Sequence, residues 1–364
     1  MKTSKLNKSA PPKYTIGLDL GDKRHALCVL DARGEIIDQR TVTNHRESLR
    51  RLAKKYPGAR LALEVGAQSP WISRFLSGLG MEVIVANPRK LRAIYQNDRK
   101  SDEQDALMLA RLARVDPALL HPIQHGSEEA QRDLLRIKLR DNLVRQRVAT
   151  IGAVRFSLKS LGVRLPSPST RVFAKRARAL LAGEPELLAA VGPSLAVVEA
   201  LTGQIVGLDR DIEALCDERY PETARLRGIR GVGPLTALCF VLVVGDAGRF
   251  AKPRQVGPYL GFVPKRDQSG SLDKQLGISK AGNAHLRRLL VGSAQYLLGP
   301  FGTDCDLRAH GLKLGARGGR GAKKKAVVAT ARKLAVVMLS LWQSGEDYRP
   351  FREESGEGTA AQAA

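Results

Sequence analysis

Residues Arg99-Lys-Ser-Asp-Glu-Gln-Asp-Ala106 form a short acidic segment that follows basic residues and precedes a helical pattern. Ser101 and Gln104 have the spacing of a capping box, which predicts that a helix begins here. Asp102 and Asp105 would then share one face of the first turn, close to the positive end of the helix dipole. Taken alone, such acids are ordinary residues of a helix start. They can hold a divalent cation only if further acids converge on them.

The composition predicts a folded protein with a polyanionic partner. The chain has 364 residues, 43% of them hydrophobic, which is enough for two or three domains with their own cores. Its 60 Lys and Arg against 36 Asp and Glu give a net charge of +24, which favours nucleic acid as the partner. A membrane surface is the competing partner. The basic residues are spread over the whole chain and no run of about 18 apolar residues is expected, so we predict no membrane association.

The termini and the cysteines indicate a cytoplasmic location. Residues 1–13 are polar and basic, without the apolar core of a secretory signal, and are expected to be a disordered arm. The cysteines are far apart and include no Cys-x-x-Cys pair, so neither a zinc module nor a disulfide framework is indicated. A reducing compartment fits these four residues: Cys28, Cys216, Cys239 and Cys305.

Residues 14–118 alternate between strand and helix patterns. Strands are predicted at 14–20, 25–30, 35–42, 60–65 and 81–86, with helices at 45–56, at 71–79 and from Ser101. Three antiparallel strands that are extended by parallel strands through helices form a ribonuclease-H-like mixed sheet. The predicted fold class is therefore α/β for this domain, followed by mainly helical domains.

Two acids of this domain stand where predicted strands end. Asp19 ends the first strand and Glu64 ends the fourth, and in the predicted sheet these strands are neighbours that face Asp102 and Asp105. Each acid alone is more often a turn residue than a ligand. Four carboxylates together repel one another unless cations neutralise them, which implies Mg²⁺ or Mn²⁺. Two such ions about 3.5–4 Å apart support phosphoryl transfer.

Residues 127–220 change character to long, charged helices with heptad-like apolar stripes, broken by a Pro-rich segment at 165–168. We expect an antiparallel helical hairpin here. It is either a spacer that buries its own stripe or a coiled coil that dimerises or binds RNA.

Residues 223–345 are expected to form a mainly helical domain. The stretch around Gly231 and Gly233 resembles the turn of a helix-hairpin-helix motif, whose backbone amides approach a DNA phosphate. A polar, glycine-bearing loop at 265–271 contains Ser269 and Ser271. A serine there is an ordinary turn residue or, near arginines that stabilise a phosphate, a nucleophile.

Basic residues and glycines along the chain are the expected nucleic-acid contacts, and a basic run at 316–325 has a solvated loop as its alternative. Residues 346–364 are expected to be a disordered tail. The predicted contacts are Arg99, Lys100, Gly231, Gly233, Lys265, Arg266, Lys280, Arg287, Arg288, Lys323, Lys324 and Lys325.

Several ordered signatures together resemble a DEDD transposase of the insertion-sequence one-ten and eleven-eleven family, from about Tyr14 to Trp342. They are Gly-Leu-Asp19, Leu-Glu64-Val-Gly with Ser-Pro-Trp71, Val-Ala-Asn-Pro88, Lys-Ser-Asp102-x-x-Asp105-Ala, Gly-Val-Gly-Pro234, Tyr-Leu-Gly-Phe-Val-Pro264, Gln-Ser269-Gly and Ile-Ser-Lys-x-Gly-Asn283.

The resemblance implies a RuvC-like nuclease domain, a coiled-coil spacer and a C-terminal transposase domain. It assigns the metal-binding catalytic acids to Asp19, Glu64, Asp102 and Asp105, and the nucleophile to Ser269, with Ser271 as the alternative. It further implies donor and target DNA as substrates, an element-encoded guide RNA, dimers that assemble into tetramers, and action at the bacterial nucleoid.

Two other functions remain open on the sequence. One is a junction-cutting nuclease that uses only the acidic site. The other is a non-catalytic nucleic-acid-binding protein.

Overall fold

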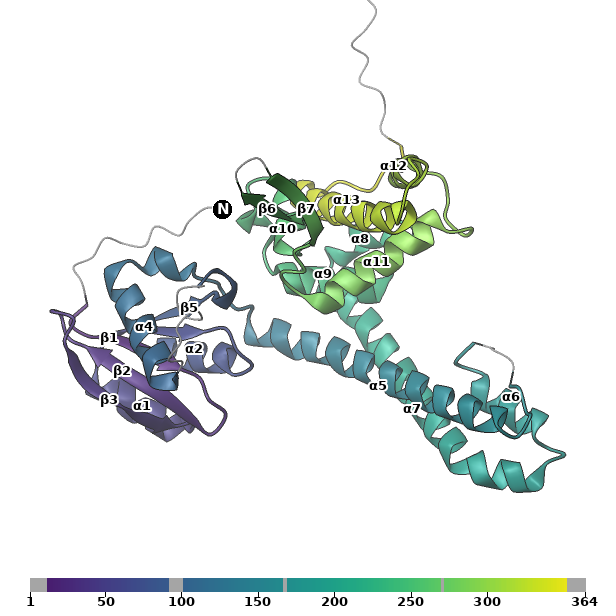
Figure 1. Cartoon of the computed structure of the whole chain (residues 1–364), viewed down its shortest axis with the longest axis horizontal. Helices are drawn as coiled ribbons and strands as arrows, with labels where there is room; N and C mark the ends of the chain where they lie inside the picture. Colours follow the sequence, from purple (N-terminus) through teal and green to yellow (C-terminus); the bar gives the residue numbers. More distant parts are fainter. Residues whose placement is uncertain (1–11, 92–100, 166–168, 270–271, 352–364) are drawn as a thin grey trace, which may run out of the picture. The chain divides into compact units, whose positions relative to one another are not determined.

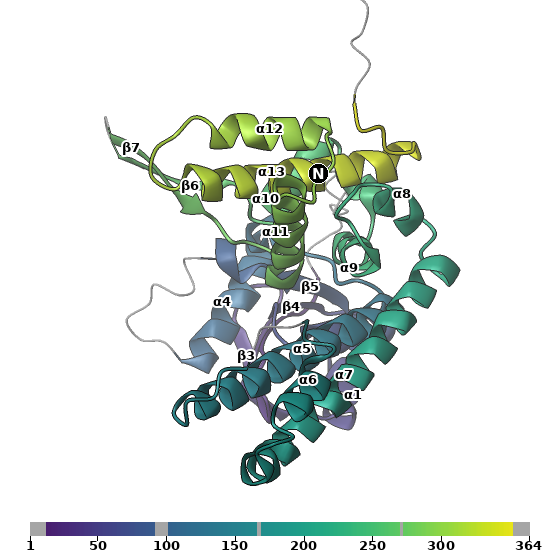
Figure 2. The same cartoon turned by 90° about the vertical axis from the view of Figure 1, so that its right-hand side faces the viewer.

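The computed structural model describes residues 12–91, 101–165, 169–269 and 272–351. The chain forms two compact units, one ending at Glu128 and one beginning at Glu129, and each is described by itself (Figures 1 and 2). The predicted contacts Arg99 and Lys100 and the alternative nucleophile Ser271 lie outside the described residues. So do residues 1–11 of the predicted disordered arm (1–13) and residues 352–364 of the predicted disordered tail (346–364).

The N-terminal unit is built on one five-stranded mixed sheet, as predicted. Its order is β3-β2-β1-β4-β5; β1 pairs antiparallel with β2, β2 pairs antiparallel with β3, and β1, β4 and β5 are parallel. The strands are β1 (Thr15–Asp19), β2 (Arg24–Leu30), β3 (Ile36–Thr43), β4 (Arg60–Glu64) and β5 (Glu82–Ala86).

Helices cover both faces of this sheet (Figure 1). On one face, Ile16 and Leu18 of β1 join a core with α1 (Arg46–Lys55) and α2 (Ser69–Gly78). On the other face lies α4 (Asp102–Val115), whose buried alanines and leucines contact β2, β4 and β5. Because strand side chains alternate between faces, Gly17 faces α4. Two 3₁₀ turns flank α4 in the sequence, at Pro88–Lys90 and Pro117–Leu120.

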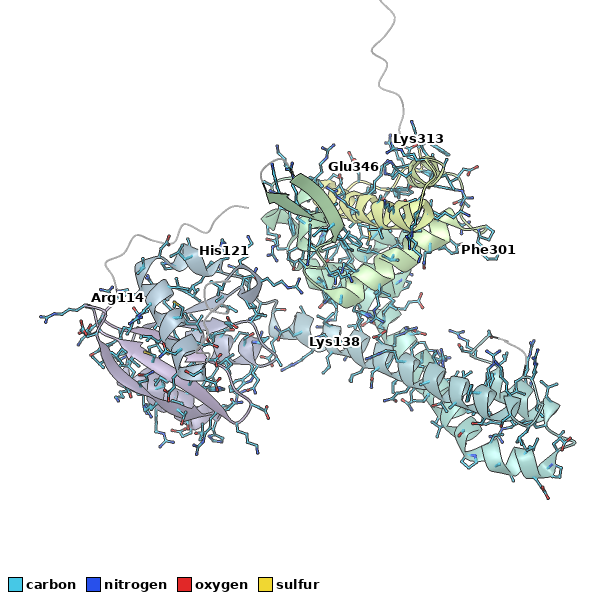
Figure 3. The ribbon with its side chains drawn as sticks, in the orientation of Figure 1. Arg114, His121, Lys138, Phe301, Lys313 and Glu346 are labelled. Atoms are coloured by element: carbon cyan, nitrogen blue, oxygen red, sulfur yellow. The ribbon has the colours of Figure 1, made fainter. Side chains whose placement is uncertain are left out.

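Gly17 allows α4 to lie directly on the backbone of β1. A Cβ atom at this position would stand 1.8 Å from the carbonyl oxygen of Ala106 and 2.7 Å from the amide nitrogen of Ala110. No side chain fits these distances, so the contact requires glycine on the strand. At the other end of α4, Arg114 donates a hydrogen bond to the carbonyl of Ala32 at 2.8 Å and ties the helix to the β2–β3 turn (Figure 3).

The C-terminal unit begins with a long antiparallel helical hairpin. Its helices are α5 (Glu128–Lys159) and α7 (Pro185–Glu218), with the short α6 (Phe173–Leu180) packed near the end where Leu158 and Leu195 are buried. Arg140 binds Asp209 at 2.7 Å, and Arg147 donates to Thr202 at 3.4 Å. The later residue of α5 thus pairs with the earlier residue of α7, so the two helices run antiparallel, as predicted.

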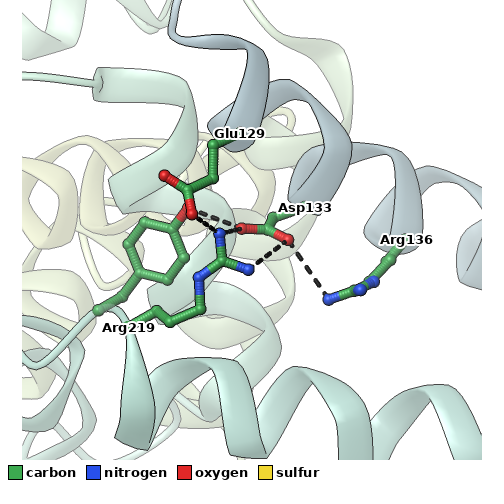
Figure 4. Close-up of polar contacts among 5 residues, drawn as sticks. Glu129, Asp133, Arg136 and Arg219 are labelled. Carbon is green, nitrogen blue, oxygen red and sulfur yellow. Dashed lines mark hydrogen bonds and ion pairs between the residues drawn. The ribbon is translucent and has the colours of Figure 1, made fainter.

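A buried carboxylate joins the start of α5 to the end of α7 (Figure 4). Asp133 is 1% exposed, accepts a hydrogen bond from the Tyr220 hydroxyl at 2.8 Å, and lies 3.3 Å from both Arg136 and Arg219. Burial, followed by the bond to Asp133, raises the pKa of Tyr220. A buried carboxylate is stable only when it is paired and hydrogen-bonded, and this one has three partners.

The rest of this unit is a helical bundle around the apolar helix α9 (Pro234–Val244). The helices α11 (Ala284–Leu298) and α13 (Ala322–Ser344) pack around it, and α12 (Asp306–Gly315) lies beside α13 (Figure 2). Short elements complete the bundle: α8 (Thr223–Arg227), α10 (Val256–Tyr259) and 3₁₀ turns at Ala247–Arg249 and Pro253–Gln255.

Of the segment predicted as a polar loop at 265–271, the described residues 265–269 belong instead to a β-strand. The strands β6 (Pro264–Ser269) and β7 (Leu272–Ile278) pair antiparallel. Lys265, Arg266 and Gln268 are all exposed, so this strand has no apolar face that would have shown as a period of two in the sequence.

In the part of the chain that the structure describes, two helices are more apolar than the sequence pattern predicted. Windows of 18 residues within α7 and α13 have mean hydropathies of 1.4 and 1.3, enough by length and composition to cross a membrane. Part of each window is buried in this fold, 44% of that in α13 and 17% of that in α7. Leu334 and Met338 of α13 are fully buried in the bundle, and Leu195 of α7 is fully buried in the hairpin.

We predict that Gly17→Ala destabilises the N-terminal unit by about 1–3 kcal/mol, because α4 must retreat from β1 to admit the methyl group. Gly78→Ala on α2 is the matched control, since a Cβ there meets nothing within 4 Å. Urea unfolding of both variants measures the difference. Equal stability of the two would contradict the direct contact between α4 and β1.

Candidate functional site

The first two predicted acids lie on neighbouring central strands. In the parallel register of β1 and β4, Leu18 is paired with Leu63, so Asp19 and Glu64 come next on adjacent strands. Alternation along the strands places Asp19 on the side of Gly17, which faces α4. Both acids are half-buried.

The other two acids lie in the first turn of the helix that covers this face. Ser101 is the N-cap of α4 and its hydroxyl accepts a hydrogen bond from the amide of Gln104 at 3.3 Å, so the predicted helix start is confirmed. Asp102 stands one turn before Ala106, which is buried against the sheet, and Asp105 stands one turn before the buried Leu109. Both carboxylates therefore stand at the sheet side of α4.

The four predicted acids interact electrostatically. The pKa of Asp19 is raised to about 6, first by burial and then by the negative charges of Asp102, Asp105 and Glu64; a hydrogen bond with the backbone of Leu20 opposes this. Four carboxylates that repel one another lower the stability of the folded protein. Groups with pKa values perturbed in this way cluster at functional sites.

The donor chemistry of this cluster suits a hard divalent cation. Carboxylate oxygens are the ligands that Mg²⁺ and Mn²⁺ take in proteins. Within the described ranges, no three Asp, Glu, His or Cys side chains converge into a ready-made ligand set. The cluster thus combines oxygen donors with the mutual repulsion of their negative charges.

Sequence reasoning missed a contact between Ser69 and His125 in the N-terminal unit. The hydroxyl of Ser69, at the start of α2, lies 2.9 Å from Nε2 of His125 and accepts a hydrogen bond from the amide of Gly66 at 3.1 Å. Burial, with a smaller effect from Arg74, lowers the pKa of His125. Ser69 belongs to the Ser-Pro-Trp signature, but nothing local in the sequence links it to a histidine 56 residues away.

Ser269 is the last residue of β6, paired with Leu272 of β7 next to the turn of the hairpin. The predicted nucleophile therefore lies at the end of β6. The predicted contacts Lys265, Arg266 and Lys280 are exposed near the hairpin's other end.

The base of this hairpin is held by backbone contacts. Gly261 and Gly282 have φ of +74° and +69°, and added Cβ atoms would stand 2.2 Å from the amide nitrogen of Ala281 and the carbonyl oxygen of Tyr259, respectively. Only glycine adopts this conformation without strain and permits the close crossing.

Arg287 and Arg288, both predicted to bind phosphate, have different surroundings. Arg287 is half-buried and its guanidinium donates to the carbonyls of Leu260, at 3.2 Å, and Ala281, so it fastens the base of the hairpin. Arg288 is exposed and binds Asp141 at 2.9 Å. The structure thus gives Arg287 an anchoring position and leaves Arg288 at the surface.

The remaining predicted contacts lie at two helix starts. Gly231 has φ of +85°, and Gly233 is the N-cap of α9. Lys323, Lys324 and Lys325 are exposed in the first turn of α13.

Comparisons with known proteins match both halves of the chain. A family described as a DEDD transposase matches residues 16–162, and one described as the transposase IS116/IS110/IS902 family matches residues 223–300. The transposase for insertion sequence element IS1111A of Coxiella burnetii is 30% identical over 92% of this chain and 91% of its own length. A probable family 20 transposase of Pseudomonas aeruginosa is 28% identical over 92% of this chain and 98% of its own length.

A shorter match is to a protein named for a different activity. The pilin gene-inverting protein of Moraxella lacunata is 28% identical over 35% of this chain and 37% of its own length.

The mixed sheet domain, the helical C-terminal region and these matches define an insertion-sequence transposase. Within that class, the chain belongs to the IS110/IS1111 family.

We predict that Asp19→Asn stabilises the protein at neutral pH when divalent cations are absent. The folded pKa of Asp19 is raised to about 6, so the charged carboxylate destabilises the fold as pH rises through about 4 to 6. Removing that charge should raise stability on the order of 1 kcal/mol at pH 7.5, after discounting for solvent screening, and have little effect at pH 4. Thermal unfolding at both pH values measures this. Glu103→Gln, at an exposed acid of the same helical turn, should show no such pH dependence.

We predict that Arg287→Ala lowers stability by about 1–3 kcal/mol, because two carbonyls lose a charged donor. Arg288→Ala should cost about 0.5 kcal/mol or less, as is usual for an exposed ion pair. Urea unfolding compares the adjacent variants, and equal losses would contradict the anchoring contacts of Arg287.

Proposed function

We propose that this protein is a DNA recombinase that moves an insertion sequence by cutting and rejoining strands with an acidic metal site and a serine nucleophile. The observation that carries the proposal is the raised pKa of Asp19 beside Asp102, Asp105 and Glu64. The strand order, with acids at the ends of β1 and β4 and on the covering helix, supports a ribonuclease-H-like, RuvC-like domain.

In this proposal Asp19, Glu64, Asp102 and Asp105 hold Mg²⁺ or Mn²⁺. A bound divalent cation supplies Lewis-acid stabilisation of charge on a phosphate. The carboxylates would hold the cation, and the bound cation would attract the scissile phosphate. Their repulsion, relieved only by positive charge, makes the site selective for a cationic partner.

Ser269 attacks the phosphorus of one DNA strand. Its Oγ forms a new P–O bond, the P–O bond to the leaving strand breaks, and the released oxygen takes up a proton as a hydroxyl. The phosphoserine keeps one phosphoester bond for each bond broken, so a second strand hydroxyl can reverse the step and rejoin the DNA without another energy source. Arg287 supports this chemistry by fixing the hairpin, as its bonds to Leu260 and Ala281 indicate.

DNA is held chiefly through its backbone in this proposal. The glycines at 231 and 233 precede α9 as in a helix-hairpin-helix element, and Lys323, Lys324 and Lys325 offer exposed charge at the start of α13. Arg99, Lys100, Lys265, Arg266, Lys280 and Arg288 complete the proposed contact set.

An element-encoded noncoding RNA is the proposed guide, as the resemblance to this family implies, and the net charge of +24 suits a nucleic-acid partner. The proposed assembly is a tetramer of two dimers that acts at the nucleoid in the cytoplasm, with the long α5–α7 hairpin as a further surface for assembly.

The competing function is a metal-dependent junction nuclease that uses the acids alone. The same electrostatic observation favours it, since the raised pKa of Asp19 concerns only the N-terminal unit.

The test is a recombination reaction with donor DNA, target DNA, co-expressed RNA and Mg²⁺. Wild type should give a protein–DNA adduct on a denaturing gel, and Ser269→Ala should abolish it while Ser271→Ala retains it. Asp102→Asn should reduce strand cleavage by about 100-fold or more, whereas Glu103→Gln should remain active.

Cleavage without an adduct, unchanged by Ser269→Ala, would establish the nuclease instead. Recombination that proceeds equally without the RNA would reject the guide. Binding with no cleavage under any metal condition would support a non-catalytic protein.

A further inference from the structure

A pocket of about 600 Å³ lies between the turn before α9 and the outer face of α11, within the C-terminal unit. This volume is in the range of sites for small organic ligands and is large enough for one nucleotide. Its lining combines cationic, aromatic and glycine residues, among them Arg227, Arg230, Gly231, Thr236, Arg288 and Tyr296.

The three arginines of the pocket differ in their charge balance. Arg227 binds Asp217 at 2.7 Å and Glu213 at 3.4 Å, and Arg288 binds Asp141 at 2.9 Å. Arg230 is exposed and has no hydrogen-bond or ion-pair partner among the residues that the structure describes. Acidic side chains thus neutralise Arg227 and Arg288 and leave Arg230 as the uncompensated positive charge. One such charge suits one phosphate group better than several.

One wall of the pocket is an aromatic ring. Tyr296 of α11 is 41% exposed, and a Cβ at Gly231 would stand 2.9 Å from its Cδ1 atom. Gly231 thus packs directly against the ring and holds it in place, while much of the ring stays accessible. An exposed, fixed aromatic ring is the usual platform on which an unpaired base stacks.

The start of α9 adds backbone donors beside the free arginine. Gly233 is the N-cap and provides no side-chain cap, and Thr236 of the first turn lines the pocket. Pro234 at the first helical position has no N–H, so the donors that favour an anion here are the amides of Leu235 and Thr236. Beside this helix start, the unpaired Arg230 offers a positive charge for a phosphate and the ring of Tyr296 offers a stacking surface for a base.

We propose that this pocket binds one unpaired nucleotide of a nucleic acid strand, with its base on Tyr296 and its phosphate between Arg230 and the first turn of α9. This inference rests on the proposed nucleic-acid function. It adds recognition of a base to the contact with the nucleic-acid backbone. A fully paired duplex cannot fill the pocket because its bases remain stacked. A strand with an extruded base or a bulge supplies both the base and the phosphate.

The test uses the full chain and short DNA duplexes that carry a single bulged 2-aminopurine, a bulged abasic nucleotide, or no bulge. Wild type should bind the bulged base roughly 5- to 100-fold tighter than either control and change its fluorescence, because stacking on one aromatic ring contributes about this factor. Tyr296→Leu should abolish this preference, and Tyr296→Phe should keep it. Equal binding of the three duplexes by wild type would overturn the proposal.

Phe301→Leu is the matched control, since Phe301 is a 78% exposed ring just beyond α11 that does not line the pocket (Figure 3). Its substitution should leave the preference intact. Arg230→Gln tests the phosphate independently and should weaken binding of the bulged duplex several-fold, whereas Arg225→Gln, at an exposed arginine outside the pocket, should not. A preference that survives both Tyr296→Leu and Arg230→Gln would refute the pocket as its source.

A ribonucleotide version of the bulged strand identifies the source of the nucleotide, since tighter binding of one sugar assigns the pocket to DNA or to RNA. Ser269→Ala should retain the preference, because the serine is not part of the pocket. A preference for the bulge without any covalent adduct in wild type therefore rejects the proposed recombinase chemistry alone. An adduct without the preference rejects the pocket alone.

Discussion

The contact of α4 with the backbone of β1 at Gly17 is the constraint on which the acidic site depends. Small residues on both sides, Gly17 on the strand and Ala106 and Ala110 on the helix, let the two backbones meet. This contact carries the first turn of α4, and with it two acids, to the ends of the central strands. Electrostatic repulsion opposes that arrangement, as the raised pKa of Asp19 shows. The apolar packing of α4 therefore holds the acids together against their own charge.

The sequence predicted much of the N-terminal unit because its signals are local. The apolar runs of the buried strands and the cap at Ser101 can be read directly from the order of residues. They correctly predicted that two of the acids stand at strand ends and two in the first turn of a helix. Their mutual distance was not predictable, since it depends on how closely α4 packs on Gly17. The hairpin at β6 and β7 was missed because its exposed, polar strands lack the alternation that marks a half-buried strand.

Adjacent arginines show a further limit of sequence reasoning. Arg287 and Arg288 are chemically identical in the sequence, but one step along a helix turns the side chain by about 100°. That rotation directs Arg287 to the carbonyls of Leu260 and Ala281 and leaves Arg288 with Asp141 at the surface. The acidic site and the serine hairpin thus share a principle of construction. Each is placed by close backbone contacts at glycine, and neither placement is visible in the proposed catalytic residues themselves.

The glycine crossings at the base of the hairpin affect how copies of a mobile gene lose activity. Nearly every change at the first two bases of a glycine codon adds a side chain, and neither Gly261 nor Gly282 has room for one. An inherited error at these codons would silence a copy while its acids and its serine stay unchanged. Judging from a genome whether such a copy can still move therefore means reading its glycines together with its reactive residues.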